Sequence, residues 1–185
     1  MQIDDRNILD KFCIDFCKII EKYTKYIIVS GFVAIASGRV RGTEDIAMII
    51  DKISKEKFSK LHEELIKSGF LCMQSDDPEE IYDLYLKDNI SIRYTPKNRL
   101  VPQMKIKFTK DALDEYQLER KIKLPLTGLD VWFNSINMNI VFKEEYLKSD
   151  KDMEDARHLR IIYEDKVDEK KIEKIKKMIN ELRLK

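Results

Sequence analysis

The hydrophobic positions of the chain follow first a helical and then a strand-like spacing. Near the N terminus they recur every three or four residues, which predicts an amphipathic helix over about residues 5–23. Short apolar runs at Tyr26–Val29 and Asp45–Ile50 predict two buried strands. A second long helix is predicted to begin after the capping residue Ser54 and to end at Gly69.

The later part of the chain reads as more strands and then as helices. Asp77 followed by Pro78 predicts the start of a short helix. The remaining predicted strands are Ile90–Thr95, Met104–Thr109 and Leu129–Phe133, and the remaining predicted helices are Ile140–Lys148, Lys151–Tyr163 and Asp168–Leu184. Because strands and helices intermix early and helices cluster late, we predict an α/β (α+β) fold, a short mixed sheet flanked by helices with a helical C-terminal part. We expect one domain over residues 1–185, with a core over 26–135 and a helical extension over 136–185 packed on it.

The composition excludes several classes of protein. Hydrophobic residues make up 43% and charged residues 37%, with only five glycines and four prolines, which excludes a disordered or collagen-like chain. No apolar run is long enough to span a bilayer, and the acidic, amphipathic start is unlike a signal peptide. Three cysteines suit a reducing compartment, so we expect a cytoplasmic protein without a membrane. The abundance of lysine and glutamate is archaeal-like and fits a thermophile.

Positive charge is concentrated in one segment, although the whole chain carries a formal net charge of only +1. Residues 87–110 contain seven basic residues and a single acid, a local charge of +6. One interpretation is a solvated edge strand, where lysines prevent aggregation. The other is an anion-binding face for phosphates or for a nucleic-acid backbone.

The segment from Ile27 to Asp51 is the most informative for function. A buried strand leads into a turn of small residues, and a short apolar helix opens there with free N–H groups that attract anions. This pattern predicts a phosphate-binding turn, although a small-residue turn before a helix also occurs without a ligand. The residues of the turn and of the loop that are expected at this end of the sheet are Ser30, Gly31, Arg39, Arg41, Thr43 and Asp45.

These residues carry a family resemblance. The segment resembles the nucleotidyltransferase superfamily, in the branch that includes abortive-infection-type toxins and many uncharacterised archaeal proteins. The residues on the family pattern are Gly31, Gly38, Arg41, Thr43 and Asp45, followed more weakly by Lys143 and by Lys151, Asp152 and Asp155. The resemblance covers about residues 26–163.

The resemblance implies a chemistry that this chain lacks in part. Such enzymes hold two Mg²⁺ ions on three carboxylates, two of them at alternate positions of one strand. Here Asp45 is the first acid, but Ala47 stands at the second position and Lys107 at the third, and Ser30 replaces the first glycine. Asp130 would supply the third acid only under a different alignment.

Three functions follow from this mixture of matches and departures. The first is a degenerate member that binds a nucleotide or another phosphorylated ligand at the Ser30–Gly31 turn, with Arg39, Arg41, Thr43, Lys107 and Lys143 as further phosphate-binding candidates. The second is an active Mg²⁺-dependent nucleotidyltransferase with an atypical metal site at Asp45. The third is a regulatory or interaction partner in a toxin–antitoxin-type system, binding a protein rather than a ligand. Nucleic acid is a possible partner of segment 87–110.

Some side chains also have simpler interpretations. Lys107 would form an ion pair with Asp45 that fills an empty site, and Arg41 would tie its loop to Asp45. His62 and His158 are predicted to be surface or boundary residues of charged helices. Cys13 and Cys17 lie on one apolar helix face, which favours buried thiols over a metal site.

Overall fold

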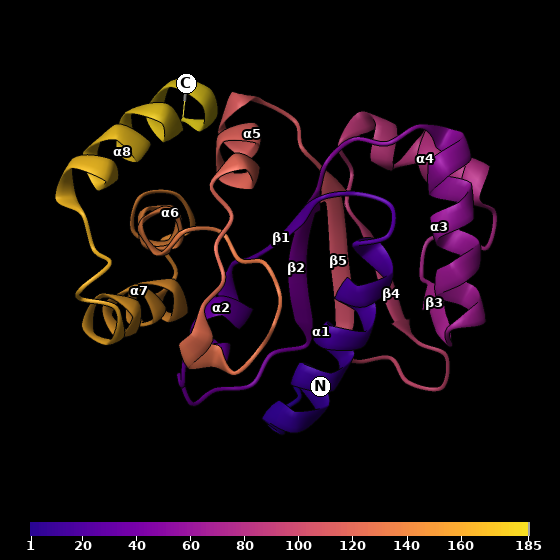
Figure 1. Cartoon of the computed structure of the whole chain (residues 1–185), viewed down its shortest axis with the longest axis horizontal. Helices are drawn as coiled ribbons and strands as arrows, with labels where there is room; N and C mark the ends of the chain where they lie inside the picture. The colour runs from indigo at the N-terminus through magenta and orange to yellow at the C-terminus, as the bar shows by residue number, and fades with distance from the viewer. Residues whose placement is uncertain (185) are drawn as a thin grey trace.

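The computed structural model describes residues 1–184 as a five-stranded mixed sheet with helices packed around it (Figure 1). The strands are β1 (Tyr26–Val29), β2 (Asp45–Ile50), β3 (Phe70–Cys72), β4 (Ile92–Pro96) and β5 (Gln103–Phe108). The helices are α1 (Arg6–Ile20), α2 (Gly31–Ala36), α3 (Lys55–Lys67), α4 (Pro78–Leu84), α5 (Ala112–Glu119), α6 (Ile136–Val141), α7 (Asp150–Ile162) and α8 (Glu169–Arg183). Two 3₁₀ turns, η1 (Leu86–Asp88) and η2 (Pro125–Thr127), and a π-helix, η3 (Phe142–Leu147), complete the elements. The predicted fold class is confirmed.

The sheet has the strand order β1-β2-β5-β4-β3. Only β2 and β5 run parallel, and the other neighbours are antiparallel. The register of the parallel pair sets Asp45 opposite Gln103, Ala47 opposite Lys105 and Ile49 opposite Lys107. Because successive side chains of a strand point to opposite faces, these odd-numbered residues share one face of the sheet.

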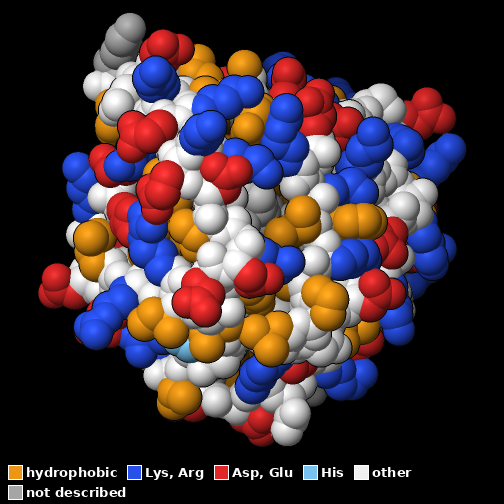
Figure 2. All heavy atoms as spheres, turned by 60° about the vertical axis from the view of Figure 1, so that its left-hand side comes forward, with side chains coloured by type: hydrophobic (Ala, Val, Ile, Leu, Met, Phe, Trp, Pro, Cys, Tyr) orange, Lys and Arg blue, Asp and Glu red, His pale blue; other side chains and the backbone are white. Residues whose placement is uncertain are grey.

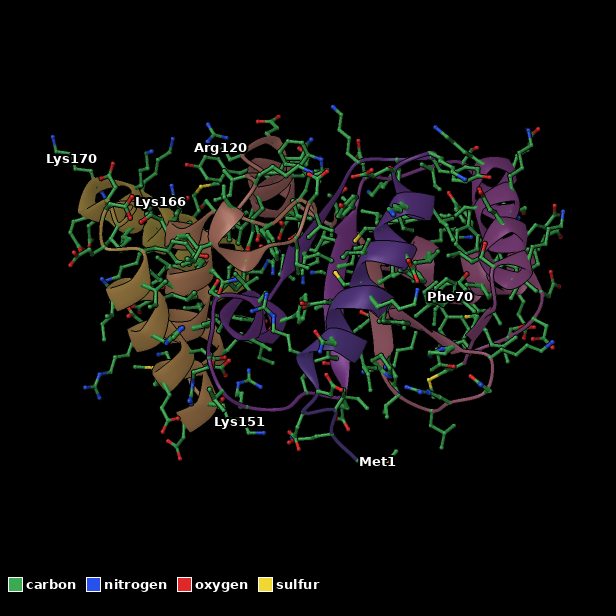
Figure 3. The ribbon with its side chains drawn as sticks, turned by 60° about the horizontal axis from the view of Figure 1, so that its bottom comes forward. Met1, Phe70, Arg120, Lys151, Lys166 and Lys170 are labelled. Atoms are coloured by element: carbon green, nitrogen blue, oxygen red, sulfur yellow. The ribbon has the colours of Figure 1, made fainter. Side chains whose placement is uncertain are left out.

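The other face of the sheet carries the main hydrophobic core. The even-numbered residues of β2 and β5 are buried there with the apolar sides of α1 and α3. Phe70 of β3 packs edge-on against Phe12 and Phe16 of α1, with ring centroids 5.8 and 5.1 Å apart. Figure 3 shows Phe70 beside α1, far from Lys166 and Lys170 of the helical part.

The opposite face is covered only in part. Leu118 of α5 packs on Ile27 and Ile49, and α5, α6 and α8 form a second apolar cluster beside it. Helices α6, α7 and α8 lie together at one end of the molecule, next to β1 and α2 (Figure 1). Their outer surface mixes basic, acidic and hydrophobic side chains (Figure 2). The candidate site lies between this helical part and the sheet.

Most predicted elements are confirmed, and three predictions need correction. The expected strand Leu129–Phe133 is irregular chain in which Phe133 alone forms bridges, to Ile28 and Ile122. The expected helix Ile140–Lys148 begins four residues earlier and continues as the π-helix η3. The basic segment does not lie on an edge strand, since the edges of the sheet are β1 and β3.

None of the helices within residues 1–184 is long and apolar enough to cross a bilayer. Cys13, Cys17 and Cys72 are all buried free thiols, so the interpretation of the first two as core residues is confirmed.

Candidate functional site

A cavity of about 380 Å³ opens between the odd-numbered face of the sheet and the helical part. Its floor is formed by β1, β2 and β5, and its walls by α5, η3 and the last turn of α8. Most of the charged groups on its lining are cationic. They are Lys105, Lys107, Lys110, Lys143 and Arg183, with Asp114 as the one carboxylate among the lining residues that the structure describes.

The strand period explains why two of these lysines meet in the cavity. Lys105 and Lys107 are alternate residues of β5, so both point to the face that α5 covers only in part. Ala47 and Ile49, their register partners on β2, line the same cavity. A small apolar residue therefore stands beside Lys105, where the resemblance implies a second carboxylate.

Asp114 is the buried anchor of the cationic side chains. Its carboxylate has no solvent exposure and accepts a hydrogen bond of 2.9 Å from Arg183 Nη2. The backbone N–H of Lys110 donates to it at 3.1 Å, and Lys107 Nζ lies 3.5 Å away. Gln117 donates to its other oxygen at 3.2 Å. One carboxylate thus serves two cationic side chains and leaves the cavity with a net positive lining.

Lys107 is a partly buried cation in this setting. Burial lowers the pKa of its ammonium, and the positive charges of Arg183 and Lys110 lower that pKa further, against the opposing effect of Asp114. The cause is that a charged amine loses water here and gains only one distant carboxylate. A negative group in the cavity would reverse this loss.

A second buried acid, Asp155 of α7, gathers three of the predicted phosphate-binding residues. Arg41 donates two hydrogen bonds to its carboxylate, at 3.1 and 2.7 Å. Lys143 Nζ lies 3.4 Å from Asp155 Oδ2, and Arg39 Nε lies 3.3 Å from Oδ1. Hydrogen bonding to Asp155 raises the pKa of Arg41, whereas burial lowers the pKa of Lys143. These three cations already have a partner within the chain.

The predicted turn is shaped around Arg41. A Cβ added at Gly31 would lie 2.6 Å from Arg41 Nη2, so only glycine lets the guanidinium pass this close. Ser30 precedes Gly31 and has φ 70° and ψ −143°, a backbone conformation that residues other than glycine rarely adopt. Ser30 also lines the cavity, so the turn forms its rim.

Asp45 and Thr43 lie together at the start of β2. Thr43 Oγ1 donates to the backbone oxygen of Asp45 at 2.9 Å. No cluster of three metal-ligating side chains is found anywhere in residues 1–184. With Ala47 two residues on and Lys105 beside it, the residues around Asp45 do not fit two Mg²⁺ ions, which need several oxygen ligands.

The structure corrects several expected pairings. Lys107 forms its ion pair with Asp114, not with Asp45, and Arg41 pairs with Asp155, not with Asp45. Asp130 is exposed and paired with Lys123, away from the cavity. The register sets Lys105, rather than Lys107, directly beside Ala47.

Sequence reasoning missed parts of this site. It did not predict α5, which carries Asp114, or the return of Arg183 from the end of α8 to the cavity wall. The alternation of lysines in β5 indicates that Lys105 shares the face of Lys107, but the sequence predicted only Lys107 as a phosphate-binding residue. Asp155 had a motif match, but nothing in the sequence marked it as the partner of three cations.

The sequence predicted His62 to be a surface or boundary residue, and this is wrong. The side chain is buried between α3 and the sheet, with Nδ1 2.8 Å from the hydroxyl of Tyr94 and Nε2 3.1 Å from the backbone oxygen of Asp76. Desolvation lowers the pKa of this imidazole. Its role is in the core and not in the cavity.

Solved structures share this arrangement of sheet and helices. The antibiotic-resistance factor ANT(2'')-Ia aligns with a TM-score of 0.54 and 16% identity, over 93% of both chains. A nucleotidyltransferase-like antigen of Paracoccidioides brasiliensis aligns with a TM-score of 0.56 and 15% identity, over 99% of this chain and 91% of the other. The fold is nucleotidyltransferase-like.

A third structure extends this nucleotidyltransferase-like group. The lincosamide antibiotic adenylyltransferase LnuA, solved with lincomycin bound, aligns with a TM-score of 0.56 and 14% identity, over 88% of this chain and 99% of the other. No family model matches the sequence, and no curated protein matches it either. At these identities the likeness concerns the fold, and the function is to be argued from the site.

Proposed function

We propose that this nucleotidyltransferase-like protein binds a nucleotide or another phosphorylated ligand in the cavity behind Ser30, without transferring a nucleotidyl group. The observation that carries the proposal is the lining of a cavity of about 380 Å³: Asp114 is the one carboxylate among its described residues, and two of its five cationic side chains, Lys105 and Lys110, have no ion pair within residues 1–184. A volume of this order suits a small molecule. Cations held in a partly buried space favour an anionic occupant.

The state of the lysines supports an anionic ligand. Lys107 is partly desolvated, with a side chain that is 25% exposed, and its carboxylate partner is 3.5 Å away and shared with Arg183. A phosphate oxygen beside Lys107 would give its ammonium a close, charge-assisted hydrogen bond. The gain is larger here than at a solvated surface, because the local dielectric is lower.

The absence of transfer is proposed from the residues beside Asp45. Ala47 provides no ligand, and Lys105 brings a positive charge to the neighbouring strand position. A single carboxylate does not hold two Mg²⁺ ions, because these hard cations give up their bound water only reluctantly. The structural neighbours that act on or bind antibiotics support a small-molecule ligand only at the level of the fold.

Isothermal titration calorimetry of the full chain with nucleoside triphosphates tests binding. We expect binding in EDTA as well as in Mg²⁺. Lys107→Gln should weaken it by about tenfold, because it removes a partly buried cation from the cavity. Lys97→Gln makes the same charge change on an exposed turn and should leave the affinity unchanged. No binding by the wild type in either buffer would overturn the proposal.

The two other functions predicted from the sequence give different outcomes. Transfer of labelled nucleotide that is abolished by Asp45→Ala would establish an active enzyme and contradict the proposed absence of transfer. A protein that co-purifies with the chain while nucleotides fail to bind would favour an interaction role.

A further inference from the structure

Two cations stand directly opposite each other on the sheet without an acidic partner. Arg93 of β4 is the register partner of Lys105 of β5 in the antiparallel pair, so the two side chains share one face. That face is the one that holds the cavity, which Lys105 lines. Arg93 therefore continues the positive lining by one strand, away from the helical part.

This pair is costly for the free protein. Like charges at opposite positions of an antiparallel pair repel and destabilise the sheet. Within residues 1–184 neither side chain has an ion pair. The acids that pair with the other cations of the lining are Asp111, Asp114 and Asp155, and none of them pairs with Arg93 or Lys105. A negatively charged ligand is the group that would offset the repulsion.

We propose that Arg93 and Lys105 form an outer anion subsite, so that the ligand carries at least two anionic groups and needs no divalent cation. The inference rests on the proposed function and adds a ligand class to it. Lys105 and Lys107 are two residues apart on β5, about 7 Å, and Arg93 is one strand away, about 5 Å. An oligophosphate group placed along this face contacts Lys107 inside the cavity and Arg93 outside it.

The same geometry favours a small oligoanion over a nucleic acid. Beyond the cavity the row of cations ends at Arg93, whereas Lys87, Lys97 and Arg99 lie on exposed turns. Tyr94, the aromatic residue next to Arg93 in β4, is fully buried on the opposite face and is not available for stacking bases. Two or three phosphates fit such a short row.

Calorimetry with inorganic tripolyphosphate and inorganic orthophosphate, both in EDTA, tests the subsite on the full chain. We expect tripolyphosphate to bind at least about tenfold more tightly than orthophosphate. Arg93→Gln should remove most of that difference, because it removes one of the two cations of the outer subsite. Lys97→Gln, the matched control, should leave both affinities as in the wild type. Excess Mg²⁺ should weaken tripolyphosphate binding, because it competes for the phosphate oxygens.

Each contrary outcome has a distinct meaning. If the wild type binds tripolyphosphate and Arg93→Gln binds it equally well, the outer subsite is wrong and the proposed function stands. If tripolyphosphate binds only with Mg²⁺, the proposal that the side-chain cations make a divalent cation unnecessary is wrong. If the wild type binds neither anion nor any nucleotide, the proposed function fails as well. If a 12-nucleotide single strand binds more tightly than tripolyphosphate and Arg93→Gln weakens that binding, the ligand is a nucleic acid and the proposed small oligoanion is wrong.

The repulsion between Arg93 and Lys105 can be tested without a ligand, by measuring thermal stability. Because Arg93 and Lys105 repel each other in the free protein, Arg93→Gln should raise the midpoint of thermal unfolding in low salt. The rise should shrink in high salt, where the repulsion is screened. A lower midpoint for Arg93→Gln than for the wild type would show that the pair has a structural role and would overturn the proposal.

Discussion

Ser30 is a serine in a backbone conformation that is typical of glycine. Its φ of 70° and ψ of −143° belong to a region that glycine occupies without cost. The turn keeps this conformation because Gly31 must admit the guanidinium of Arg41 and because α2 begins at once. The sequence resemblance implies glycine at position 30, and the backbone confirms that glycine would fit.

Ser30→Gly should therefore stabilise the fold, by about 1 kcal/mol, through relief of backbone strain. Urea unfolding measures this gain as a higher midpoint concentration with an unchanged m-value. Ser54→Gly is the matched control, since Ser54 also caps a helix but has an ordinary φ of −66° and a side chain that accepts from Lys57 N–H. That control should lose a few tenths of a kcal/mol. Equal losses for both variants would contradict the account of Ser30.

His62 makes the stability of the core depend on pH. Its native-state pKa is lowered by burial, whereas the unfolded side chain has a pKa near 6.5. Below about pH 6.5 the unfolded chain thus binds a proton that the native core excludes, and stability falls as the pH decreases. Above that pH both states are neutral and the effect disappears.

His62→Gln should therefore flatten the decrease in unfolding free energy between about pH 7 and pH 5 relative to the wild type. Denaturant unfolding at several pH values measures the slope. A wild-type slope in His62→Gln would contradict the assignment.

At the scale of elements, Asp155 of α7 ties three segments together. It receives Arg41 from the loop before β2 and Lys143 from η3, and its carboxylate has no exposure. Helix α7 also packs against α2, and Tyr163 beyond its end bonds Ser37 at 2.8 Å. Removing the acid would leave buried cations without a partner.

Asp155→Asn should consequently destabilise the protein by about 3–5 kcal/mol, the range for breaking a buried ion pair from one side. Glu154→Gln, one residue earlier and on the exposed side, should change stability by no more than about 0.5 kcal/mol. Chemical denaturation of both variants provides the comparison. A small effect at Asp155 would mean that the cluster does not join these elements.

An element can be predicted from the sequence when its stabilising contacts lie within its own segment, and less well when they come from distant segments. Helices such as α1 and α3 carry caps and a long apolar period of their own, so the sequence indicated them closely. The strand β3 has three residues and α5 has eight, and both depend on packing against distant segments. Leu129–Phe133 has strand composition, but its bridges to Ile28 of β1 and to Ile122 form only at Phe133, so no continuous strand results.

At the scale of the molecule, the cavity joins residues that are far apart in the sequence. Lys107 on β5, Lys143 on η3 and Arg183 at the end of α8 meet only because the helical part folds back over the sheet. The sequence predicted Ser30, Lys107 and Lys143 as ligand-binding residues, and all three line the cavity. Their roles stay predictions, as does the division into a core and a helical extension.

We propose, as the central point, that the cationic cavity binds a phosphorylated ligand and that Asp45 does not support nucleotidyl transfer. The direct measurement is equilibrium dialysis of the full chain against a nucleoside triphosphate labelled on its α-phosphate, in EDTA and in Mg²⁺, followed by analysis of the recovered nucleotide. We predict that the protein retains nucleotide in both buffers and that all of it is recovered unchanged. No retention in either buffer, or a new labelled product in Mg²⁺ that Asp45→Ala abolishes, would contradict the account.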